Sequence, residues 1–149
     1  MIKVIGFDLG GVYLSDCWNK SVREKIADKF NIQKEMIEEN NKKIENVISE
    51  GKISEDVFLR NVIGDVTKIK EVKDYIRQLN RIIYPELLQL MINLKENYRL
   101  VVMNNEAKEW NDFRIKKFNL KQIFEEFFRM ITGIDDAVIP AYKFVPGIF

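Results

Sequence analysis

The chain has 149 residues, a formal charge of +1 and 46% hydrophobic residues, so it is long enough to bury one core and too evenly charged to predict a nucleic-acid partner. It contains no histidine, which excludes histidine-based triads and zinc sites, and its single cysteine, Cys17, excludes an internal disulfide. The apolar run of residues 2–7 is too short for a signal peptide, and no run approaches about 18 residues, the length of a membrane span. We therefore expect a cytoplasmic protein that binds neither nucleic acid nor a membrane.

The first half of the chain changes from an apolar segment to a long helical pattern. Residues 2–7 are rich in β-branched side chains and are followed by Gly10 and Gly11, which predicts a strand buried in a parallel sheet. From residue 17 to residue 81, Lys, Glu, Asn and Ile recur at helical spacing, which predicts about four helices. Ser54 is expected to cap one of them.

The remaining sequence alternates between helical and strand-like segments. Residues 85–97 form an amphipathic pattern with Pro85 as the first helical residue. Its apolar stripe consists of Leu87, Leu88, Met91, Ile92 and Leu94. Residues 99–103 predict a second buried strand, residues 108–118 a helix with Trp110, Phe113 and Phe118 on one side, and residues 127–132 a third strand. This order is typical of an α/β sheet.

Asp8 is the first candidate for chemistry, because it directly follows a predicted buried strand. Open α/β sheets bind ligands at the carboxyl ends of their strands. Gly10 and Gly11 would let the backbone approach a ligand closely, and the N–H groups of this loop could hold an anion. A structural turn is the alternative interpretation of the same pattern.

Four further groups are weaker candidates. Asn104 and Asn105 follow the second predicted strand and could donate to phosphoryl or carboxylate oxygens, although asparagine is also common in turns and caps. Lys143 by itself is typical of a solvated surface. An acidic turn is the preferred interpretation of residues 135–136, and Cys17, which has no histidine to activate it, is expected to be inert.

Four segments carry a resemblance when they are taken together. Residues 7–12 read FDLGGV, residues 51–58 read GKISEDVF, residues 99–105 read RLVVMNN and residues 143–149 read KFVPGIF. In this order they resemble the first motif, a helical-cap segment, the second motif and the third motif of the haloacid dehalogenase (HAD) superfamily. The similarity is to its group of helical-cap phosphatases, dehalogenases and epoxide-hydrolase N-domains.

The resemblance implies an architecture. A Rossmann-like parallel-sheet core of residues 1–16 and 82–149 would carry a helical cap, residues 17–81, inserted after the first strand. The family's fourth motif, an acidic pair after a further strand, would lie beyond Phe149, so the core is expected to be incomplete at its C-terminus. The strand of residues 2–7 would then have an exposed edge through which a homodimer is possible.

The resemblance also implies roles for individual residues. Asp8 would be the nucleophile that forms an aspartyl intermediate, and Lys143 would hold it and neutralise charge. Leu9, Gly10 and Gly11 would bind the transferred group through their backbone. Asn104 would replace the usual Ser or Thr of the second motif, next to Asn105. Mg²⁺ is the implied cofactor, with Asp8 and the Gly10 carbonyl as its ligands.

Two substitutions and the missing motif weaken the expected activity. The second aspartate of the first motif, the usual general acid and base, is Gly10, and the second-motif hydroxyl is replaced by Asn104. The leading hypothesis is a phosphatase of a small phosphorylated metabolite, weak or inactive in this form. A dehalogenase-like hydrolase and a non-catalytic relic that binds an anion or a partner are the alternatives.

Overall fold

A computed structural model describes residues 3–129 of the chain. Three parallel strands form the sheet: β1 (Val4–Phe7), β2 (Arg99–Asn104) and β3 (Glu126–Arg129), in the order β1-β2-β3. The predicted α/β class with a parallel sheet is therefore confirmed. Strand β1 lies at one edge of the described sheet, and the homodimer through that edge stays a prediction.

The central strand, β2, packs into a hydrophobic core that belongs to the sheet and its helices. Leu100 and Val102 of β2 are 0% and 1% exposed and belong to a cluster with Met91 of α5 (Glu86–Lys95). The same cluster includes Leu120 of the short 3-10 helix η2 (Leu120–Gln122), which follows α6 (Lys108–Lys117). These helices connect the strands, as a parallel sheet requires.

Two sequence expectations for these helices were wrong in detail. Pro85 is the N-cap of α5 and lies outside the helix, and Ile92 is 46% exposed, so it does not belong to the buried stripe. In α6, Trp110 packs into the core of the inserted helices, whereas Phe118, just after the helix, packs into the sheet cluster. These aromatic side chains therefore do not share one side, because α6 and its C-terminal end lie between two cores.

Four α-helices separate β1 from α5, as the sequence predicted, and we call them the helical unit. They are α1 (Lys20–Phe30), α2 (Lys34–Ser49), α3 (Glu55–Ile63) and α4 (Ile69–Leu79), with the short 3-10 helix η1 (Val66–Lys68) before α4. The Val57 N–H donates to Ser54 Oγ over 3.4 Å, so the predicted cap is confirmed. Among the described helices, none is both long and apolar enough to cross a membrane.

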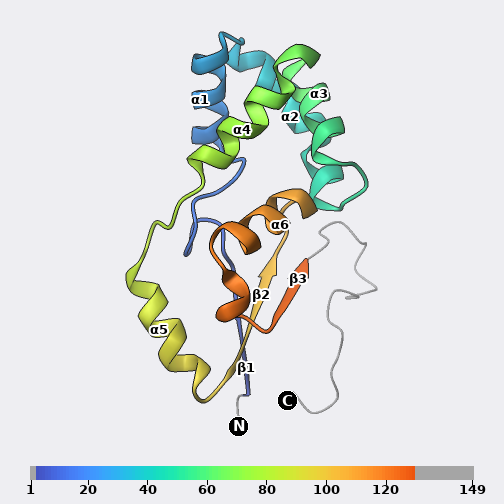
Figure 1. The fold of residues 1–149 in the computed structure, drawn as a ribbon. Coiled ribbons are helices and arrows are strands. Elements are labelled where there is room, and N and C mark those ends of the chain that lie inside the picture. The colour runs from blue at the N-terminus through green and yellow to red at the C-terminus, as the bar shows by residue number, and fades with distance from the viewer. Residues whose placement is uncertain (1–2, 130–149) are drawn as a thin grey trace.

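Two chain connections join the helical unit to the sheet. They run side by side: Ser15 N donates to Arg81 O over 2.9 Å, and Ile83 N donates to Tyr13 O over 3.0 Å. Between β1 and this pair of connections, the chain makes a tight turn. In this turn Gly11 has a φ of 68° and Leu14 N donates to Leu9 O. The helical unit lies beyond the carboxyl ends of the strands (Figure 1).

Candidate functional site

Asp8 lies at the carboxyl edge of the sheet, on the side of the helical unit. The register pairs Phe7 with Val102, so Asp8 follows β1 beside the last residues of β2. The Asp8 side chain is exposed, and its Oδ1 accepts a hydrogen bond of 2.7 Å from Leu9 N. The neighbouring Leu9 is 1% exposed and anchors the loop in the sheet core.

The two asparagines after β2 have different surroundings. Asn104 is 3% exposed, and its amide exchanges two hydrogen bonds with the amide of Asn111, of 2.8 Å and 2.9 Å. Asn105 is exposed and lines a cavity. Both residues lie at the carboxyl end of the strands, as Asp8 does. Their roles in binding a phosphoryl group stay predictions. Lys143 and residues 135–136 lie outside the described residues.

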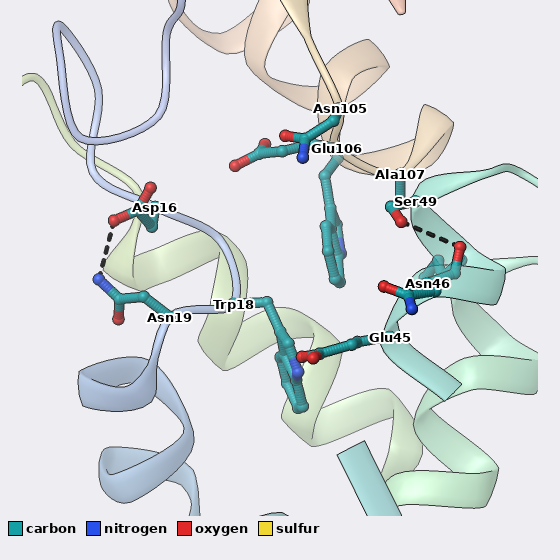
Figure 2. Close-up of a pocket in the computed structure, with 11 residues that line it drawn as sticks. Asp16, Trp18, Asn19, Glu45, Asn46, Ser49, Asn105, Glu106 and Ala107 are labelled. Atoms are coloured by element: carbon teal, nitrogen blue, oxygen red, sulfur yellow. Dashed lines mark hydrogen bonds between the residues drawn. The ribbon is translucent and has the colours of Figure 1, made fainter. Parts of the chain in front are cut away.

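A cavity of about 320 Å³ lies between the loops that follow β1 and β2 and the α2 helix of the helical unit, and Asp8 is not among the residues that line it. The loop after β1 contributes Asp16 and Trp18, the segment around the start of α6 contributes Asn105, Glu106 and Trp110, and the C-terminal end of α2 closes the far side. Figure 2 shows the Asp16 and Glu106 side chains on the sheet side of the cavity, with Glu45 and Asn46 on the opposite side. Two carboxylates, those of Asp16 and Glu106, therefore lie beside aromatic and aliphatic side chains in this lining.

Gly10 lies against two carboxylates that sequence analysis did not select. A Cβ on Gly10 would lie 2.8 Å from Asp16 Oδ1 and 3.0 Å from Glu106 Oε1. Neither residue belongs to a motif: Asp16 comes after the turn that follows β1, and Glu106 follows the asparagine pair. Only the folding of the two loops against each other brings them together, and no spacing in the sequence indicates it.

Arg114 of α6 forms hydrogen bonds with both the loop after β1 and the loop after β2. Its side chain is completely buried, and its Nε donates to Asn80 Oδ1 over 2.8 Å. Its Nη1 donates to Glu106 Oε2 and its Nη2 to the Ser15 carbonyl oxygen. Burial raises the pKa of the Glu106 carboxyl, and the Arg114 guanidinium opposes that rise. Arg114 therefore connects the segments that contain Ser15 and Asn80 to the loop after β2, which contains Glu106.

Cys17 lies next to this network without joining the cavity surface. Its side chain is 1% exposed, and its thiol donates to Asn80 Oδ1 over 3.4 Å. Burial raises the pKa of the Cys17 thiol far above its usual range, with the negative charge of Glu106 acting in the same direction. A thiol that stays protonated is a poor nucleophile, so Cys17 is a structural residue.

The oxygen donors near Gly10 are compatible with a magnesium ion. Mg²⁺ prefers oxygen ligands and commonly uses one or two carboxylates together with water and substrate phosphate. The Asp8 carboxylate is exposed, and the Gly10 carbonyl is the second ligand that the HAD resemblance implies. Within residues 3–129, no group of three or more His, Cys, Asp or Glu side chains is arranged to hold a metal.

In sequence, the chain matches no protein-family model and no curated protein. In structure, it is similar to a variant of the HAD family enzyme bt-2542 from Bacteroides thetaiotaomicron, crystallised with magnesium and inorganic phosphate. That match has a TM-score of 0.66 and 19% identity, over 85% of this chain and 67% of the other.

Two further solved structures support the same fold. The HAD-hydrolase YfnB from Bacillus subtilis, bound to magnesium, has a TM-score of 0.57 and 15% identity over 85% of this chain and 64% of its own. A 2-haloacid dehalogenase from Pseudomonas syringae has a TM-score of 0.51 and 18% identity over 85% and 63%. The chain therefore has the fold of HAD family enzymes and spans about two thirds of their length.

Proposed function

We propose that the chain is a HAD-type hydrolase that removes the phosphoryl group from a small phosphorylated metabolite through an aspartyl-phosphate intermediate. The observation that carries this proposal is the position of Asp8. It is an exposed carboxylate directly after a parallel strand, at the end of the sheet where Asn105 and Glu106 line a cavity. Such a carboxylate can attack phosphorus.

The neighbouring groups have complementary tasks in this proposal. The backbone N–H groups of the loop after β1 would bind the phosphoryl oxygens, and Asn105, at the cavity surface, is the amide best exposed to assist them. Asn104 would act indirectly, since its amide is engaged with Asn111. Mg²⁺, held by Asp8 and the Gly10 carbonyl, would neutralise negative charge on the phosphoryl group when it is bound.

A dehalogenase-like reaction is the second candidate, and the fold similarity to a 2-haloacid dehalogenase supports it. That chemistry also uses an aspartate nucleophile but attacks carbon. The two reactions differ in the product they release, which is phosphate in one case and halide in the other.

The experiment that tests the proposal measures phosphate release from 4-nitrophenyl phosphate and halide release from 2-chloropropionate, each with and without Mg²⁺. We expect phosphate release only, dependent on Mg²⁺, and its loss in Asp8→Asn, which keeps the shape of the side chain but is not a nucleophile. Halide release would favour the second candidate. Phosphate release that persists in Asp8→Asn would exclude Asp8 as the nucleophile.

A further inference from the structure

The position two residues after Asp8 has no side chain, yet a carboxylate from another part of the loop lies beside it. Asp16 Oδ1 is 2.8 Å from the point that a Cβ on Gly10 would occupy. A carboxylate nucleophile can displace an alkoxide efficiently only if an acid nearby protonates the leaving oxygen. Asp16 Oδ1 therefore lies where the side chain of an acid two residues after Asp8 would begin.

The backbone holds Asp16 in this place. The turn after β1 closes on itself, with Gly11 N donating to Leu14 O over 2.8 Å, so the chain returns toward Gly10. Ser15, the next residue, is fixed on both sides: its N–H donates to Arg81 O, and its carbonyl accepts from the buried Arg114. The position of Asp16 is thus set by groups that are themselves anchored.

A neighbouring side chain sets the orientation of the carboxylate. Asn19 Nδ2 donates to Asp16 Oδ2 over 2.8 Å, and Asn19 Oδ1 accepts from Val22 N over 3.0 Å as the N-cap of α1. Because both ends of the Asn19 amide are engaged, it holds Oδ2 of Asp16 and leaves Oδ1 on the Gly10 side. Figure 2 shows this pair at the edge of the cavity, with the Glu106 side chain extending toward it.

Glu106 is the other carboxylate near Gly10, and its surroundings give it a different task. Its Oε2 accepts from Arg114, whose side chain is completely buried. A proton transferred to and from Glu106 would repeatedly leave that guanidinium without its counter-charge, which is unfavourable in a buried place. The hydrogen bond to Asp16 comes from a neutral amide, so a change of its charge leaves no buried cation unpaired.

We propose that Asp16 is the general acid and base of the hydrolysis proposed above, on which this inference rests. In the first step, an Asp8 oxygen bonds to phosphorus, the bond to the leaving oxygen breaks, and the Asp16 carboxyl gives its proton to that oxygen. In the second step, water attacks phosphorus and gives a proton to Asp16, and the bond between Asp8 and phosphorus breaks. Inorganic phosphate is released, and both side chains return to their starting states.

The test compares two aryl phosphates, 4-nitrophenyl phosphate and phenyl phosphate, whose leaving groups differ in how much they need a proton. In Asp16→Asn, we expect kcat/KM for phenyl phosphate to fall by about 10²-fold, and kcat/KM for 4-nitrophenyl phosphate to change by less than about threefold. The matched control is Glu39→Gln, which removes one exposed carboxylate on the surface of α2 and should change neither value.

A second variant tests orientation alone. Asn19→Ser keeps an oxygen that can cap α1 but removes the amide that holds Asp16, so we expect a smaller loss confined to phenyl phosphate. This variant also tests the role of Asp16 if Asp16→Asn does not fold. An equal loss on both substrates, or no loss on either, would overturn the role of Asp16 while leaving Asp8 in place. Absence of phosphate release by the unmodified chain would overturn the proposed function itself, and this inference with it.

Discussion

The indole of Trp110 donates a hydrogen bond of 2.7 Å to Glu55 Oε1, and this contact joins α6 of the sheet layer to α3 of the helical unit. Glu55 is 1% exposed, and its two oxygens also accept from Arg77 of α4 over 2.7 Å and 2.6 Å. One buried carboxylate therefore holds three helices together. The cavity beside it has walls from both layers, so its shape depends on this contact.

Replacing Glu55 should destabilise the whole fold. In Glu55→Ala, the Arg77 guanidinium and the Trp110 indole lose their acceptor, and breaking a buried ion pair by removing one partner costs about 3–5 kcal/mol. Glu39→Ala, which breaks an exposed pair with Lys43, should leave the free energy of unfolding nearly unchanged. Urea unfolding followed by tryptophan fluorescence measures both free energies. A loss within about 1 kcal/mol for Glu55→Ala would contradict a structural role for this carboxylate.

Placing at Gly10 the aspartate that the HAD pattern expects should destabilise the protein. In Gly10→Asp, the new Cβ would lie 2.8 Å from Asp16 Oδ1, and a third carboxylate would enter a space that already contains two. We expect a loss of stability of about 1–3 kcal/mol from crowding and charge repulsion.

Two related variants separate these causes. Gly10→Ala adds the Cβ without the charge and should cost less, because the φ of Gly10 is not among the positive ones and the Asp16 carboxylate can rotate. Gly10→Asp combined with Asp16→Asn should recover part of the loss, since neighbouring residues couple. Unfolding free energies of the three variants check this, and a Gly10→Asp variant as stable as the parent would be the contrary result.

Cys17 should react with thiol reagents only after unfolding. The side chain is 1% exposed, and its raised pKa keeps the thiol protonated well above neutral pH, whereas the thiolate is the reactive form. Because the shift is upward, raising the pH to 9 should accelerate the reaction of the unfolded chain far more than that of the folded one. Titration with 5,5′-dithiobis(2-nitrobenzoate) in buffer and in urea measures the difference, and rapid reaction of the folded protein would count against it.

Local patterns in the sequence were sufficient for most of the elements and for the position of Asp8 at the end of a strand. The β-branched run before Asp8, the apolar run of residues 99–103 and the Ser54 cap depend on interactions within a few residues, and the structure contains each of them. A strand of this kind ends at the ligand-binding edge of any parallel sheet, so the position of Asp8 also followed from its neighbours.

Only the tertiary structure decided which groups meet across long separations in the sequence. Arg114 reaches the carbonyl of Ser15, 99 positions earlier, and Trp110 reaches Glu55, 55 positions earlier. The exposure of Ile92 was also decided by the tertiary structure. Helical spacing predicts which face of a helix is apolar, but it does not predict how much of that face the neighbouring layers cover. The sequence alone determined the strands, the helices and Asp8, because those depend on local conformational preference. The carboxylates around Gly10 depend on how two loops pack over a buried arginine, and no periodicity along the chain encodes that contact.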